Sequence, residues 1–140
     1  MVGLGPGARS YTQSLHYSSE FAVGQQGVKS IIADFNRRSD VEFGRADYGT
    51  WLNENEQQRR YVIKSLLRST GLDRAAYENR FGSTVDDDFP QLIELAELNL
   101  SHSKGKRLWL NEEGLSWSDV IGPWLYSDDV VSQMKAFELV

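Results

Sequence analysis

The sequence of 140 residues contains no cysteine. Disulfide bonds, zinc fingers, thiol nucleophiles and cysteine-ligated iron–sulfur clusters are therefore excluded for these residues. No apolar run approaches the roughly 20 residues that a transmembrane helix needs. The opening MVGLGPGARS lacks the basic start and the long apolar stretch of a signal peptide. We therefore predict a cytoplasmic protein without a membrane span.

The sequence also has fewer basic than acidic residues. Fifteen lysines and arginines stand against 20 aspartates and glutamates, which gives a net charge of −5. Affinity for nucleic-acid phosphates depends on clustered cations, so an acidic chain is a poor nucleic-acid binder. The hydrophobic content of 40% and the four tryptophans are typical of a globular protein. A chain of this length forms one domain, or one domain with an appended segment.

The chain divides into two parts at about residue 52. The turn-forming residues between Val2 and Tyr11 predict a strand end that runs into a loop. Hardly any strand precedes this loop, so its partner strands are expected elsewhere. Residues 38–52 are polar and predict a connecting loop. Between the two loops, apolar residues at helical spacing predict a short helix: Val28, Ile31, Ile32 and Phe35.

Three helices are expected between residues 53 and 100. Asn53 can cap a helix of about 53–69, which Thr70 and Gly71 end. Asp73 can cap a shorter helix closed by Gly82. A third helix is expected to start near Pro90, and three aspartates, Asp86 to Asp88, precede it. Its apolar face is predicted to contain Phe89, Leu92, Ile93, Ala96 and Leu100.

A hairpin and further helices follow. Leu98–Ser103 and Arg107–Asn111 predict two strands joined by a turn. Ser116 can cap a helix that Pro123 breaks early, with a face of Trp117, Val120, Ile121 and Trp124. The tail, 128–140, predicts a last amphipathic turn or two. The order helix, helix, helix, hairpin, helix favours an α+β, mostly helical fold, with a winged-helix-like domain over 53–140.

Two motifs each allow two interpretations. The glycines of GLGPGAR (3–9) fit neither a dinucleotide fingerprint nor a P-loop. They indicate either a tight loop or a close approach of backbone to a ligand. The run Asp86–Asp87–Asp88 could be a cation site, but consecutive side chains do not converge on one ion. A helix N-terminus, where carboxylates are stabilised, is the simpler interpretation.

Basic residues mark one side of the helix at 53–69: Arg59, Arg60, Lys64 and Arg68. They form either a solvated face paired with Glu54 and Glu56 or an anion site for carboxylates. DNA readout is rejected, because the helix after Gly82 carries five acidic residues and no basic one. The two histidines are too few for a zinc site, and no G-x-S-x-G motif is present.

Several stretches together resemble one family. GLGPGARSY (3–11), LHYS (15–18) and FAV (21–23) resemble the end of the catalytic barrel of oxygen-independent coproporphyrinogen III oxidases and their heme-chaperone relatives. EQQRRYVIKSLLRSTGLDRAAYENRFG (56–82) resembles the start of that family's C-terminal domain, and FPQLIELAELNL with LWLNEEGLSWSDVIGPWL continues it. The resemblance covers nearly the whole chain.

The resemblance implies a radical S-adenosylmethionine (SAM) enzyme, whose barrel holds a [4Fe–4S] cluster on a C-x-x-x-C-x-x-C motif. In the oxidases this chemistry converts two propionates to vinyl groups in heme biosynthesis. The present chain has no cysteine. It is therefore expected to be a C-terminal fragment that binds no cofactor alone and whose partner is the missing N-terminal barrel. Residues 1–52 would be a barrel-end segment, poorly ordered alone or held by a second copy.

The resemblance also implies site residues. Gly5, Gly7, Ala8, Arg9 and Ser10 match the segment that borders SAM, and Arg59, Arg60 and Lys64 are expected to anchor substrate propionates. The alternative is a non-catalytic module that binds a tetrapyrrole such as heme, or a protein, through the aromatic residues Trp109, Trp117 and Trp124. A homodimer formed through exposed apolar surface is a further expectation.

Overall fold

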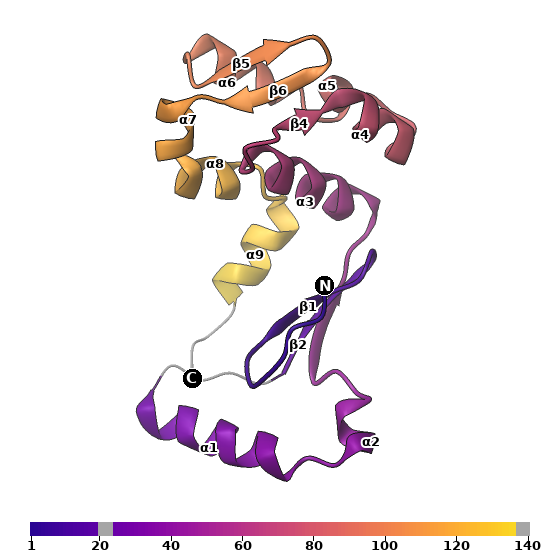
Figure 1. Ribbon diagram of the computed structural model, residues 1–140, viewed down its shortest axis with the longest axis vertical. Helices are drawn as coiled ribbons and strands as arrows, with labels where there is room; N and C mark the ends of the chain where they lie inside the picture. The colour runs from indigo at the N-terminus through magenta and orange to yellow at the C-terminus, as the bar shows by residue number, and fades with distance from the viewer. Residues whose placement is uncertain (20–23, 137–140) are drawn as a thin grey trace. The chain divides into compact units, whose positions relative to one another are not determined.

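A computed structural model describes residues 1–19 and 24–136 (Figure 1). The predictions for 21–23 and for the end of the tail lie outside these residues. The described chain forms two compact units. The first unit contains residues 1–57 and the chain from Ser132, and the second unit contains 58–131. The fold is α+β and mostly helical, as predicted.

The second unit begins within a long helix and continues through short elements. They are α3 (Glu54–Leu66), β4 (Leu72–Asp73), α4 (Arg74–Phe81), α5 (Val85–Asp88), a 3₁₀ turn η1 (Pro90–Leu92), α6 (Ile93–Glu97), β5 (Ser101–Lys104), β6 (Arg107–Leu110), α7 (Glu112–Ser116), α8 (Ser118–Trp124) and the start of α9 (Asp128–Ala136), whose residues from Ser132 belong to the first unit. Asn53 Oδ1 accepts the Glu56 N–H at 2.9 Å, and Asp73 Oδ1 accepts the N–H groups of Ala75 and Ala76. Gly82 closes α4 with φ of 76°. The predicted caps of α3 and α4 are therefore confirmed.

A three-stranded antiparallel sheet has the order β4-β6-β5. The predicted hairpin is present, and Gly105 turns it with φ of 60°. Its first strand starts at Ser101, because Leu98 still caps α6. The short strand β4 is an addition that the sequence pattern did not predict: Leu72 pairs with Leu108, and Asp73 with Arg107.

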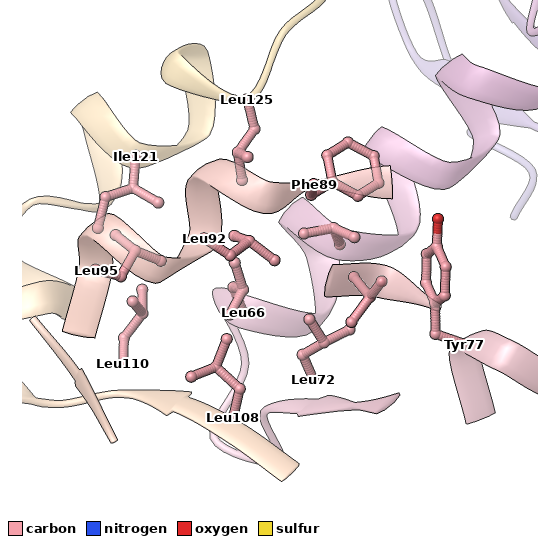
Figure 2. Close-up of a cluster of buried hydrophobic side chains, with 12 residues drawn as sticks. Leu66, Leu72, Tyr77, Phe89, Leu92, Leu95, Leu108, Leu110, Ile121 and Leu125 are labelled. Carbon is pink, nitrogen blue, oxygen red and sulfur yellow. The ribbon is translucent and has the colours of Figure 1, made fainter. Parts of the chain in front are cut away.

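The core of the second unit lies between this sheet and the helices (Figure 2). Leu108 and Leu110 of β6 point into the cluster, toward Leu66 and Leu95. The buried members are Val62, Leu66, Leu72, Tyr77, Val85, Phe89, Leu92, Leu95, Leu108, Leu110, Ile121 and Leu125. Burial of such side chains is the main favourable contribution to folding.

The third predicted helix starts at Pro90 as expected, but its first turn, η1, is a 3₁₀ turn. Phe89, with φ of −133° and ψ of 63°, separates it from α5, a short helix that the sequence pattern did not predict. The residues that face the core also differ from those predicted. Leu95 is 3% exposed, whereas Ile93, expected inside, is 64% exposed. The aspartate run lies in the first turn of α5, so the helix N-terminus interpretation is confirmed.

The predicted cap at Ser116 is also wrong. Asn111 caps α7, where its Oδ1 accepts the Gly114 N–H at 2.8 Å, and the Ser116 hydroxyl donates back to the Glu113 carbonyl. Only Ile121 and Trp124 of the predicted face pack into or against the core, since Trp117 and Val120 are about half exposed. Helix α8 ends at Trp124, directly after Pro123, so the early break is confirmed.

The first unit contains a second antiparallel sheet, in the order β1 (Arg9–Tyr11), β2 (Leu15–Ser18) and β3 (Tyr48–Trp51). The predicted helix is α1 (Gln25–Arg37), and a short α2 (Asp40–Phe43) follows it. Two expectations are therefore wrong: the opening strand finds its partners within the chain, and 38–52 is not all loop. Ser39 and Glu42 form a capping box, and Arg38 Nη2 lies 2.6 Å from Asp47 Oδ2, which together fix α2.

Asp73 links the stability of the second unit to pH. The N–H of Ala76, followed by the hydrogen bond from Arg107 Nη2 at 2.7 Å, lowers the pKa of this carboxyl below its ordinary value of 3.8. A lowered folded-state pKa adds stability that is present at neutral pH and is lost as the pH falls through that pKa. We expect Asp73→Asn to be less stable than the wild type at about pH 6, and the difference to shrink toward about pH 3. Urea unfolding at several pH values measures this, and a constant difference would contradict it.

Candidate functional site

Three backbone N–H groups of the glycine-rich loop at residues 3–8 are taken up by hydrogen bonds to the loop itself or to nearby serines. Gly7 donates to the Ser19 hydroxyl at 2.9 Å, Ala8 to the Gly5 carbonyl at 3.2 Å, and Gly3 to the Ser10 hydroxyl at 3.0 Å. Gly5 and Gly7 have φ of 100° and 69°, which only glycine adopts freely. The interpretation as a tight loop therefore describes the local geometry.

Two of the five residues expected near SAM are open to a ligand. A Cβ on Gly5 would meet no atom within 4 Å, and the Arg9 side chain is exposed. Ser10, in contrast, is 4% exposed. The pocket beside this loop, between Pro6 and Ser19 on one side and Ile31 and Phe35 on the other, has room for about one water molecule. This geometry alone is not a complete site for a molecule as large as SAM.

The basic residues in and after α3 point in two directions, toward the protein and toward solvent. Arg59 is half-buried and faces the protein, where its Nη1 donates to the Leu125 carbonyl at 2.9 Å and its guanidinium lies 5.5 Å from the Phe89 ring centre. Arg60 and Lys64 are four residues apart, the spacing of neighbours on a helix surface, and Arg68 lies in the bend that follows α3. Lys64 and Arg68 are exposed.

Electrostatics connects these three cations. Partial burial, followed by the positive charges of Arg60 and Arg68, lowers the pKa of the Lys64 ammonium. Within residues 1–19 and 24–136, neither Lys64 nor Arg68 forms an ion pair. The arrangement can accept an anion, because the charges of Lys64 and Arg68 are not neutralised locally.

The three consecutive aspartates have three different sets of partners. Asp86 receives hydrogen bonds from Arg74, Asp87 from Thr84, and Asp88 from Gln58, Tyr77 and Ser83. Over the described part of the chain, no group of three or more histidines, aspartates and glutamates could hold a metal ion. With no cysteine in the sequence, these residues do not fit a [4Fe–4S] cluster.

The aromatic residues considered for binding differ in exposure. Trp109 stacks on His102 with ring centres 5.4 Å apart, and Trp124 packs against the core. Trp117 is 49% exposed, with Leu115 and Val120 also exposed. A cluster that the sequence interpretation missed lies beside α3, where the Arg80 guanidinium covers the rings of Tyr61 and Phe81 at 5.4 and 5.1 Å.

A comparison with known families finds a similarity over the middle of the chain. Residues 52–117 match the family model described as the HemN C-terminal domain. These residues, slightly less than half of the chain, are similar to a HemN C-terminal domain. The resemblance to radical SAM proteins of the coproporphyrinogen oxidase and heme-chaperone family is thereby confirmed. No curated protein and no solved structure matches the chain.

Only one of the two candidate sites lies within the residues that match the family model. The matched residues include α3 with its basic side, the sheet β4-β6-β5 and α7. The glycine-rich loop lies outside the matched residues. No helix of the described residues is long and apolar enough to cross a membrane. The basic side of α3 is therefore the candidate site that the family match includes.

Proposed function

We propose that this chain is the substrate-covering C-terminal part of a cytoplasmic radical SAM oxidoreductase that resembles oxygen-independent coproporphyrinogen III oxidase. The family match over 52–117 carries the proposal. The absence of cysteine supports the proposal that a separate N-terminal barrel, and not this chain, holds the [4Fe–4S] cluster. The parent enzyme would convert propionates to vinyl groups in heme biosynthesis, and this chain would not be catalytic by itself.

In this proposal the chain supplies binding rather than chemistry. Arg60 and Lys64 would hold substrate propionates by charge-assisted hydrogen bonds. Arg59, expected with them from the sequence, would support the site by bonding the Leu125 carbonyl at the end of α8. The open backbone at Gly5 and the exposed Arg9 would lie next to SAM in the joined protein, with Gly7, Ala8 and Ser10 shaping that loop.

Reconstitution tests the proposal. The chain is joined to a cysteine-bearing N-terminal barrel of the same family, the cluster is rebuilt, and conversion of coproporphyrinogen III is measured. We expect activity with the joined protein and none with either part alone. The variant Arg60→Gln with Lys64→Gln should raise KM several-fold, because each lost ion pair of an exposed site changes binding by about two- to fivefold. Lys104→Gln, a change at an exposed cation on the hairpin, is the control. A joined protein that cleaves SAM but leaves this substrate unchanged would overturn the proposal.

A second candidate is a non-catalytic module that binds heme or a protein. The exposed apolar residues Leu115, Trp117 and Val120 favour it, since exposed apolar surface often marks contacts with partners. The same surface would serve a homodimer. Heme binding by the chain alone, abolished by Trp117→Ala and unaffected by Arg60→Gln, would favour this function over the first.

A further inference from the structure

The outer edge of β3 is an unpaired strand edge. Within the described residues, β3 is the last strand of the order β1-β2-β3 and pairs only with β2. The opposite edge of this sheet is covered, because Met1 and Tyr11 of β1 exchange two backbone hydrogen bonds at 2.8 and 2.9 Å. All four residues of β3 are exposed, and the strand contains neither a charged residue nor a proline that would protect its edge from pairing.

The register of β3 on β2 decides which backbone groups point outward. Leu52, the residue that follows β3, donates to the Ser14 carbonyl at 2.8 Å. Opposite residues of an antiparallel pair alternate between hydrogen-bonded and non-hydrogen-bonded pairs. This alternation directs the backbone of Thr50 toward β2, whereas the N–H and C=O groups of Gly49 and Trp51 point toward the open edge.

The side chains of β3 leave an uncovered glycine beside an exposed aromatic ring. Gly49 lies opposite Tyr17 of β2, where a Cβ would be 3.4 Å from the Tyr17 Cβ. Trp51 projects from the same face of the sheet and is 75% exposed. An aromatic side chain from a neighbouring strand can cover a glycine at the edge of a sheet. A strand that brings such a ring to Gly49 would therefore fit this edge.

The first unit also buries little apolar surface by itself. Within its described residues, no large apolar side chain is buried, whereas the second unit contains the core of Figure 2. Val41 and Tyr48 are 72% and 56% exposed. A partner that covers such side chains stabilises the unit, because it removes apolar surface from water.

We propose that the outer edge of β3 pairs with the same edge of a second copy of this chain, as antiparallel strands related by a two-fold axis at Thr50. The two three-stranded sheets then form one sheet of six strands. In this register Gly49 of one copy exchanges both of its outward backbone bonds with Trp51 of the other copy. The indole of each Trp51 covers the Gly49 of the opposite copy. The inference does not depend on the proposed function.

A second copy fits this edge because β3 is complementary to itself. The outward groups of Gly49 and Trp51 lie symmetrically on either side of Thr50, as a two-fold axis requires. Tyr48 of one copy would lie opposite Leu52 of the other, which gives an apolar cross-strand pair. The strand carries no charge, so pairing with itself brings no like charges together. The contact is small, and we therefore expect a weak dimer that depends on protein concentration.

Disulfide crosslinking of the whole chain tests the register, since the sequence has no cysteine of its own. Thr50→Cys places two thiols across the two-fold axis with Cα atoms about 4.5 Å apart, within the range of a disulfide. Tyr48→Cys is the matched control, because its two copies would be more than about 13 Å apart. Under mild oxidation we expect Thr50→Cys to form a linked dimer and Tyr48→Cys to stay mainly monomeric on a non-reducing gel.

Proline at position 51 tests the outward hydrogen bonds. Trp51→Pro removes an N–H that points away from β2, a place where an edge strand tolerates proline. We expect the dissociation constant of the dimer, measured by analytical ultracentrifugation, to rise by about tenfold or more, because each copy loses a backbone bond and an indole contact. Val41→Ala shortens a side chain of similar exposure in the same unit and should leave the constant unchanged.

Three outcomes would overturn the inference. Equal crosslinking of Thr50→Cys and Tyr48→Cys would show random collision instead of a fixed register. A dimer that Trp51→Pro retains and Trp117→Ala loses would place the contact on α7 and α8. The third is a chain that stays monomeric at every concentration; protection of the Gly49 amide from exchange only in the protein joined to the barrel would then assign the edge to the barrel. None of these results depends on the reconstituted activity.

Discussion

Replacement of Gly114 by alanine is expected to destabilise the second unit by about 3 kcal/mol, at the upper end of the cost of overpacking. Gly114 lies inside α7, where alanine is normally favoured over glycine by about 1 kcal/mol. Here a Cβ would overlap the Leu100 carbonyl oxygen and lie 3.2 Å from the Leu110 Cβ.

The Leu100 carbonyl cannot move away from the added Cβ without breaking other hydrogen bonds. The Leu100 carbonyl accepts the Asn111 N–H at 3.1 Å, and Asn111 in turn caps α7 and donates to the Asn99 carbonyl at 2.6 Å. Moving this carbonyl would break the base of the hairpin and the start of α7 together. The measurement is the free energy of unfolding in urea, followed by tryptophan fluorescence.

Gly122→Ala in α8 is the matched control. Apart from its chain neighbours and the backbone of its own helix, a Cβ there would meet no atom within 4 Å. Pro123 follows and restricts the residue before it, so we expect a change within about 1 kcal/mol of zero rather than the full gain in helix propensity. Equal stability of the two variants would show that the close packing of α7 on Leu100 is not present in solution.

Asp88→Ala is expected to cost about 3 kcal/mol as well. Asp88 Oδ2 accepts hydrogen bonds from Tyr77 Oη at 2.7 Å, from Gln58 Nε2 at 3.0 Å and from Ser83 Oγ. Gln58 and Tyr77 are buried, and a buried donor that loses its acceptor costs about 1–3 kcal/mol. This one carboxylate ties α3, α4 and α5 together.

Asp87→Ala provides the comparison, because it removes a neighbouring carboxylate of the same helix. Asp87 is exposed and accepts a hydrogen bond from Thr84 Oγ1 at 2.6 Å. Its loss should cost about 0.5–1 kcal/mol through the helix N-terminus. Combining Asp88→Ala with Tyr77→Phe should cost less than the sum of the two single changes. Similar losses for Asp87→Ala and Asp88→Ala would contradict the network.

Local chemistry made much of this fold predictable. The caps at Asn53 and Asp73 and the stop at Gly82 depend on hydrogen bonds and dihedral angles within a few residues, so the sequence alone was sufficient. The same holds for the hairpin turn at Gly105 and for the spacing that places Arg60 and Lys64 on one side of α3. The lack of cysteine excludes a cysteine-ligated cluster on composition alone.

The candidate site was predictable only in part. The sequence pattern grouped Arg59 with the other cations of α3. Residue type and spacing alone do not show which of these side chains faces the protein and which faces solvent. Contact with Leu125 and Phe89, residues distant in the sequence, decides that Arg59 faces the protein. Likewise, three adjacent aspartates are equivalent as a sequence run, and only their partners on other elements make Asp88 structural.

The sequence by itself therefore determined the helical and hairpin character of 53–126, the basic side of α3 and the absence of cysteine ligands. Tertiary structure alone decided the pairing of β4 with β6 and of β3 with β2, the break at Phe89 and the need for glycine at position 114. The physical reason is the range of the interactions. Caps and turns are satisfied within a few residues, whereas strand pairing and core packing depend on groups that folding brings together from distant positions.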